Sequence, residues 1–214
     1  FTEFGSGFKI AMRDMEIRGT GNLLGPEQHG QISAVGYDLY CKMLSEAIRE
    51  MKGEDVSKPV ETVVDFKVDT YIDDSYISGE NHKLQMYKRI AAIEEPEDKF
   101  DVEDEMIDRF GDIPEPTRNL IQISYIRAMA GRLGFAEILQ RGGEVRMKLR
   151  DSRTLSPRAL MITVNENHKR LRLVGSNPPL LILKLGNGDG SEALNAVAEI
   201  LEKIKDLQES EIKV

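Results

Sequence analysis

The segment RGTGNLLGPEQHG, residues 18–30, combines four glycines with one arginine and one glutamine. Glycine permits positive φ and tight turns, at a cost of roughly 0.5–1 kcal/mol relative to alanine in regular structure. Arg18 could complement a helix dipole or bind a carboxylate or phosphate through its guanidinium fork, and Gln28 can donate and accept hydrogen bonds together. The segment is therefore either an ordinary turn between two helices or a loop that contacts another backbone or changes shape.

A second candidate is FDVEDEMIDRFG, residues 100–111. Helical spacing of i, i+3, i+4 and i+7 places four carboxylates on one face, while Val102, Met106 and Phe110 form another face that can pack inward. Like charges at i, i+4 destabilise a helix by a few tenths of a kcal/mol. The acidic face is either a solvated helix surface or a contact for a basic partner. Its members are Asp101, Asp104, Glu105 and Asp108.

Residue patterns of a self-sufficient enzyme are missing from the sequence. There is no phosphate-binding G-x-x-x-x-G-K-[ST], no G-x-G-x-x-G and no G-x-S-x-G. The three histidines lie far apart, with no second ligand type at metal spacing, so no metal site is predicted. Cys41 is the single cysteine, which excludes an intrachain disulfide and fits a reducing, cytoplasmic compartment.

The composition is that of a soluble globular chain. Its 214 residues are 40% hydrophobic and 31% charged, with a formal net charge of -8. That charge argues against the bulk surface being a nucleic-acid platform, although a local basic site could still exist. No run of eighteen apolar residues or signal peptide is apparent, so no membrane contact is expected. The chain opens at Phe1 in what looks like the middle of an element, which suggests a segment of a longer protein.

Glycine, proline and hydrophobic spacing predict an α+β fold in two parts. Two helices joined by the glycine-rich loop are expected over residues 1–55, followed by a helix-rich α+β domain with a small sheet over 56–214. The polar stretch GEDVSKP marks the boundary. The expected helices cover 5–18, 34–53, 80–93, 96–110, 114–134, 157–164 and 191–208, and the expected strands cover 62–70, 136–139, 144–149, 170–174 and 180–185.

The first part resembles the translocation motif of the RecG and Mfd family of DNA translocases, over GFKIAMRDMEIRGTGNLLGPEQHGQISAVGYDLY. The resemblance implies a helical hairpin and hook that couple ATP-driven closure of two motor lobes to stepping along double-stranded DNA. The coupling arginine and glutamine of that motif fall on Arg18 and Gln28. The first helix of the hairpin and every ATP-binding motif are missing from this chain. The other matching residues are Ile17, Gly19, Gly21, Gly25 and Gly30.

The second part resembles the C-terminal domain of transcription-repair coupling factors, over residues 66–91 and 104–134, with the D-R-F-G-x-x-P signature at 108–114. The resemblance implies a domain that docks on a module similar to the repair protein UvrB and masks a UvrA-binding surface in the resting enzyme. Glu105 and Asp108 are the implied acidic contacts, with Asp101 and Asp104 beside them. Arg109 is expected to make an internal ion pair instead.

The function implied is that of a fragment of a cytoplasmic bacterial DNA-dependent ATPase, which displaces stalled RNA polymerase and recruits nucleotide excision repair. The fragment itself would hold no cofactor and catalyse nothing, since ATP and Mg²⁺ would bind in the motor lobes of the longer protein. Its partners would be duplex DNA through that motor, the UvrB-like module, and indirectly UvrA and RNA polymerase. The alternatives are a stand-alone interaction adaptor and a fragment of a RecG-like fork-remodelling helicase, which the further domain after Lys58 disfavours.

Overall fold

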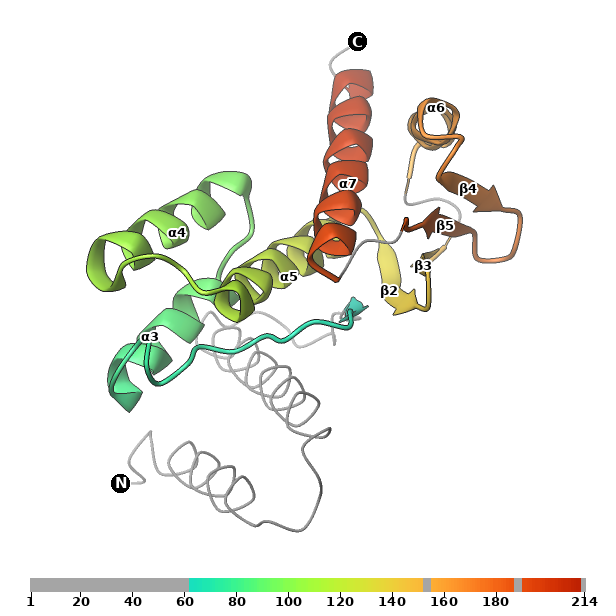
Figure 1. Cartoon of the computed structure of the whole chain (residues 1–214). Coiled ribbons are helices and arrows are strands. Elements are labelled where there is room, and N and C mark those ends of the chain that lie inside the picture. Colours follow the sequence, from blue (N-terminus) through green and yellow to red (C-terminus); the bar gives the residue numbers. More distant parts are fainter. Residues whose placement is uncertain (1–61, 152–154, 187–189, 213–214) are drawn as a thin grey trace, which may run out of the picture. The chain divides into compact units, whose positions relative to one another are not determined.

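The computed structural model describes residues 62–151, 155–186 and 190–212 (Figure 1). The chain divides into two units, residues 1–53 and 54–214, and every described residue belongs to the second. The glycine-rich loop and both helices predicted before residue 54 therefore lie outside the described residues. The boundary predicted between residues 55 and 56 stays a prediction.

The described residues form the α+β fold that the sequence predicts, with helices first and most strands later. The elements in order are β1 (Val63–Asp65), α3 (Glu80–Ala91), α4 (Pro96–Phe110), α5 (Glu115–Arg132), β2 (Phe135–Arg141), β3 (Glu144–Leu149), α6 (Pro157–Glu166), β4 (Leu171–Val174), β5 (Leu180–Lys184) and α7 (Gly190–Ile212).

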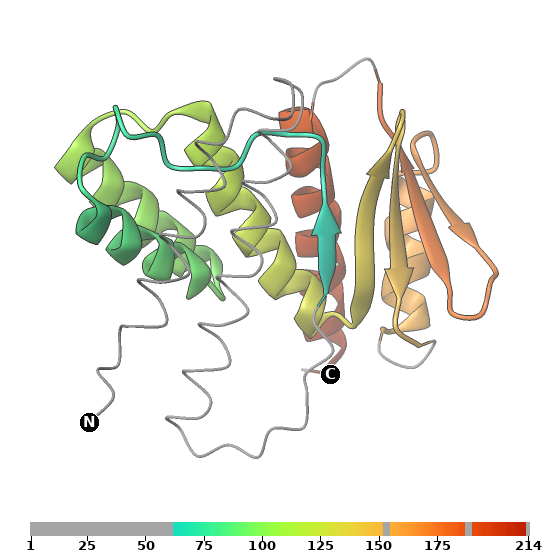
Figure 2. The same cartoon turned by 90° about the horizontal axis from the view of Figure 1, so that it is seen from below.

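The strands form one mixed sheet in the order β1-β2-β3-β5-β4, seen side by side in Figure 2. β1 pairs with β2 in parallel, and the other neighbours are antiparallel. Because side chains alternate between the two faces of a strand, Val145 and Met147 point to one face together with their partners Leu183 and Leu181. All four are fully buried. Figure 1 shows α6 and α7 on one side of the strands.

The strand predicted at residues 62–70 is much shorter than expected. Only Val63–Asp65 pairs with another strand, β2. After Asp65, backbone groups of the chain form hydrogen bonds with side chains instead of with a strand. The amide of Lys67 donates to Gln140 Oε1 at 3.0 Å, Asn119 Nδ2 donates to the carbonyl of Asp69 at 3.3 Å, and Thr117 Oγ1 donates to the carbonyl of Tyr71 at 2.9 Å. Side chains thus provide hydrogen-bond partners for backbone groups of this segment, which therefore needs no neighbouring strand.

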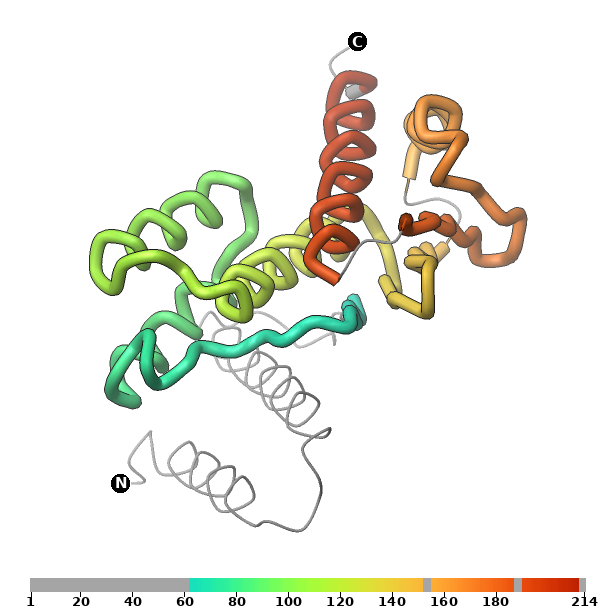
Figure 3. The backbone as a smooth tube through the Cα atoms, viewed as in Figure 1, coloured from blue at the N-terminus to red at the C-terminus, as the bar shows by residue number. Residues whose placement is uncertain are grey.

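Helix α5 forms the centre of the described domain. Eleven of its eighteen residues are buried, including Leu120, Ile121 and Ile126. It contacts α3 and α4 as well as α7, β1 and β2. Figure 3 shows it running between the α3–α4 pair and α7. Every residue from 119 to 126 is buried, so the middle of this helix belongs to the core.

Tyr125 on α5 joins this core to α7. It is 2% exposed, and its hydroxyl donates to Glu202 Oε1 at 3.0 Å. The ammonium of Lys99 lies 5.6 Å from the centre of its ring. Burial, reinforced by the carboxylate of Glu202, raises the pKa of Tyr125 well above its usual range.

Because an unfolded tyrosine ionises near pH 10 while Tyr125 keeps its proton in the folded chain, we expect the free energy of unfolding to fall as pH rises above about 10. Tyr125→Phe should flatten that decline and cost about 1 kcal/mol at neutral pH, through the lost hydrogen bond. Urea unfolding at several values between about pH 8 and 11 measures both effects. Burial also raises the pKa of Tyr76, so part of the decline should remain. Identical pH dependence in the two proteins would contradict the assignment to Tyr125.

Candidate docking site on helix α4

A proline and a glycine mark the two ends of helix α4 in the sequence. Pro96 occupies its first turn, and Gly111 follows its last residue with φ 85°, a conformation that favours glycine. The side chain of Glu95 accepts a hydrogen bond from the backbone of Asp98, while the side chain of Asp98 accepts one from the amide of Glu95 at 2.9 Å. This capping box fixes the first turn.

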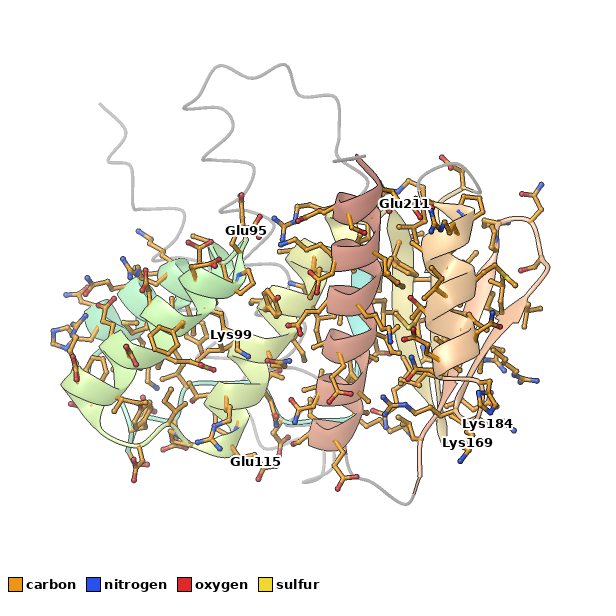
Figure 4. All side chains as sticks on the ribbon, turned by 90° about the horizontal axis from the view of Figure 1, so that it is seen from above. Glu95, Lys99, Glu115, Lys169, Lys184 and Glu211 are labelled. Atoms are coloured by element: carbon orange, nitrogen blue, oxygen red, sulfur yellow. The ribbon has the colours of Figure 1, made fainter. Side chains whose placement is uncertain are left out.

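The start of α4 is also held by the neighbouring helices. Glu95 forms ion pairs with Arg132 of α5 and, at 2.9 Å, with Lys205 of α7. Lys99 Nζ donates to Gln122 Oε1 of α5 at 2.6 Å, and both Glu95 and Lys99 are labelled in Figure 4. At the other end, Tyr76 Oη donates to the carbonyl of Gly111 at 3.0 Å. The helix is therefore anchored at both ends.

The inner face of α4 packs as predicted for two of its three residues. Val102 is 2% exposed and Met106 is fully buried, whereas Phe110 is only half-buried. Its ring makes an edge contact with Tyr76, with centroids 6.1 Å apart. The inner face thus secures the helix to the domain.

The opposite side of α4 exposes two large apolar residues among carboxylates. Phe100 is 62% exposed and Ile107 is 48% exposed. Asp101, Asp104 and Asp108 are exposed beside them, and none of these three side chains forms an ion pair or hydrogen bond with any residue that the structure describes. We call these five residues the outer α4 face.

Glu105 differs from the other three predicted carboxylates, because arginines hold it inside the domain. Arg89 Nη2 of α3 lies 3.1 Å from Glu105 Oε2, and Arg109 Nη1 lies 2.5 Å from Glu105 Oε1. Arg109 also lies 4.9 Å from the centre of the Phe110 ring. The internal ion pair predicted for Arg109 is confirmed. The external contact predicted for Glu105 stays a prediction, and its internal partners leave Asp104 and Asp108 as the freer carboxylates.

The sequence interpretation missed Phe100 and Ile107. The signal was present, since both residues fall off the stripe formed by Val102 and Met106, and apolar residues outside the packing stripe of a helix are exposed. The residues predicted to couple ATP hydrolysis to DNA translocation lie outside the described residues, so their roles stay predictions. They are Arg18, Gly19, Gly21, Gly25, Gln28 and Gly30.

Other kinds of site find no support in the part of the chain that the structure describes. No group of three or more His, Cys, Asp or Glu residues there is placed to hold a metal ion. Nor does any helix in the described ranges combine the length and apolar character needed to cross a bilayer. The outer α4 face is therefore the candidate that the geometry favours, and its chemistry suits a partner surface that is both basic and apolar.

Comparison with known proteins identifies the class to which this domain belongs. A family model described as the TRCF domain matches residues 66–160, which include α3, α4, α5, β2 and β3. A crystal structure of the C-terminal domain of a transcription-repair coupling factor has a similar fold, with a TM-score of 0.64 and 19% identity, and the match covers 70% of this chain and 95% of that one. The described domain is an α+β domain of the TRCF class.

Curated relatives extend the similarity to nearly the whole chain. The transcription-repair-coupling factor of Bacillus subtilis (strain 168) is 38% identical over 216 residues, which cover 99% of this chain and 18% of the relative. That of Staphylococcus haemolyticus (strain JCSC1435) is 39% identical over 199 residues, or 86% of this chain and 17% of the relative. The chain belongs to the transcription-repair-coupling factor family, and it spans about a fifth of the length of these relatives.

Proposed function

We propose that this part of a coupling factor is a reversible docking domain, and that the outer α4 face is its contact surface. The observation that carries the proposal is the exposure of Phe100 and Ile107 beside three carboxylates that have no partner among the described residues. Exposed apolar side chains in an acidic setting suit a surface that offers arginine or lysine around an apolar patch. The ion pair of Glu105 with Arg89 holds α4 against α3, which keeps this face in a fixed position.

The chemistry of this face suits a contact that can open. An exposed ion pair contributes only about 0–1 kcal/mol, and burying an apolar side chain fully contributes about 1.5–3 kcal/mol. Two apolar residues and a few ion pairs can hold a closed state and still yield to a competing partner. A switch of this kind requires two states that differ in these contacts.

The family resemblance suggests the partner and the outcome. The face would dock on the UvrB-like module of the same protein and so mask the surface that binds UvrA, which holds the coupling factor in a resting state. Residues 1–55 would couple ATP hydrolysis to movement on duplex DNA through Arg18 and Gln28. ATP and Mg²⁺ would bind in motor lobes outside this chain, and the whole protein would displace stalled RNA polymerase in the cytoplasm. That the reported relatives are coupling factors favours this proposal over a fork-remodelling helicase.

The test compares UvrA binding by a full-length coupling factor that contains this chain, with and without changes on the outer α4 face. We expect Asp104→Ala with Asp108→Ala to raise the affinity for UvrA about three- to tenfold, which corresponds to the loss of two exposed ion pairs. Phe100→Ala with Ile107→Ala should raise it at least as much. Titration of the resting protein, without nucleotide or DNA, measures the effect.

Asp69→Ala with Asp206→Ala is the matched control, because it removes two exposed carboxylates away from α4. This control should bind UvrA as the unaltered protein does. Unchanged UvrA binding by both α4 variants, with folding intact, would contradict the docking role. Such a result would favour a domain that acts as an adaptor for some other partner.

A further inference from the structure

Charge is divided sharply along the described domain. Residues 62–140 contain nine Lys and Arg against seventeen Asp and Glu, whereas residues 141–186 contain ten Lys and Arg against three Asp and Glu. The second stretch includes β3, β5, β4 and α6. A chain with a net charge of -8 thus contains a strongly basic segment that includes three neighbouring strands.

The register of the sheet gathers several of these cations on one face. Arg146 of β3 pairs with Ile182 of β5, which pairs in turn with Arg172 of β4. Residues directly opposite one another in paired strands point to the same face, and so do residues two apart in one strand. Lys148 and Lys184 therefore lie on the face that carries Arg146 and Arg172. We call these four residues the basic sheet face.

This face is opposite the packed one. The intervening residues Val145, Met147, Leu181 and Leu183 are fully buried on the other face, which leaves the cations directed outward. Arg146, Arg172 and Lys184 are exposed, and Lys148 is half-buried. The exposed Lys169 lies just outside β4, where the amide of Lys184 donates to the carbonyl of the adjacent Arg170 at 2.7 Å. Figure 4 labels Lys169 and Lys184 in the same corner of the domain.

Some of these cations already have partners, and others do not. Lys148 lies 3.2 Å from Glu137, and Arg172 lies 3.4 Å from Glu144. Arg146, Lys169 and Lys184 form no side-chain hydrogen bond or ion pair with any residue in the described ranges. Clustered cations without carboxylate partners raise the local positive potential and favour a polyanion.

We propose that the basic sheet face binds the phosphate backbone of double-stranded nucleic acid without regard to sequence. Phosphate contacts from arginine and lysine supply most of the affinity of such binding. The kind of nucleic acid follows from a second observation, since the sequence has no Phe, Tyr or Trp after Phe135. Single strands are held largely by bases stacked on aromatic rings, and this face has none to offer. A duplex needs only backbone contacts.

The experiment titrates the 214-residue chain against a fluorescent DNA duplex of about 30 base pairs over a series of salt concentrations. We expect binding to weaken linearly on a plot of log affinity against log salt. Arg146→Ala with Lys184→Ala should reduce the magnitude of that slope by about two, because each lost phosphate contact removes roughly one unit. A single strand of equal length should bind more weakly than the duplex.

Lys83→Ala with Lys88→Ala on α3 is the matched control, because it changes the net charge equally outside the basic sheet face. It should leave the slope unchanged. Failure of the chain to bind duplex, equal loss in both double variants, or tighter binding of the single strand would each overturn the proposal. Concentration-dependent self-association that Arg146→Ala with Lys184→Ala abolishes, without DNA binding, would show that the face meets an acidic surface of a second copy instead.

Discussion

Replacing Met106 with alanine is expected to lower the free energy of unfolding by about 2–4 kcal/mol. Met106 is fully buried on the inner side of α4. Truncation removes apolar contacts and leaves a cavity that anchored helices cannot close, because α4 is fixed at both ends by Glu95 and by the contact between Tyr76 and Gly111. Urea unfolding of the chain, followed by circular dichroism, measures the change.

Ile107→Ala provides the control for this prediction, since the next residue along the same helix faces the other way. Ile107 is 48% exposed, so its truncation should change stability by no more than about 0.5 kcal/mol. The two variants should also separate stability from docking, because only Ile107 belongs to the outer α4 face. Equal losses of stability in the two variants would contradict the orientation of α4, in which Met106 faces the core and Ile107 faces outward.

Gly190→Ala is expected to destabilise the domain by about 1–3 kcal/mol, although alanine is normally the better helix residue. Gly190 begins α7, where the chain after β1 passes very close to it. A Cβ atom at this position would clash with Cγ1 of Val68 and would lie 2.7 Å from the carbonyl oxygen of Lys67. A backbone carbonyl cannot rotate away as a side chain can, so one of the two segments must move.

Gly175→Ala is the matched control, because no atom lies within 4 Å of a Cβ placed there. This change should be neutral or slightly stabilising, through the reduced freedom of the unfolded chain. Thermal unfolding of the two variants side by side checks the prediction. A loss in Gly190→Ala no greater than that in Gly175→Ala would contradict the close approach between α7 and the segment after β1.

Local signals in the sequence predicted most of the elements. The bounds of α4 match the structure because Pro96 and the glycine after Phe110 mark its ends, and β3 matches because its buried residues alternate strictly. The α+β class followed from the order of helices and strands. Element bounds depend on neighbours along the chain, which a sequence displays directly.

Long-range contacts explain what the sequence could not reveal. Glu105 shares an acidic spacing with Asp101 and Asp108, yet its ion pair with Arg89 joins two helices and changes its role. The parallel pairing of β1 with β2 links residues more than seventy positions apart. Only three residues of the strand predicted over 62–70 take part in it. The basic sheet face depends likewise on β5 lying between β3 and β4.

The burial of the middle of α5 on all sides has a mechanical consequence. Because α5 contacts α3 and α4 as well as the sheet and α7, a force applied to α4 by a docked partner is carried through one rigid helix into the whole domain. If the outer α4 face docks as proposed, a contact of a few kcal/mol would part under load before the fold that presents it, and the intact domain could dock again.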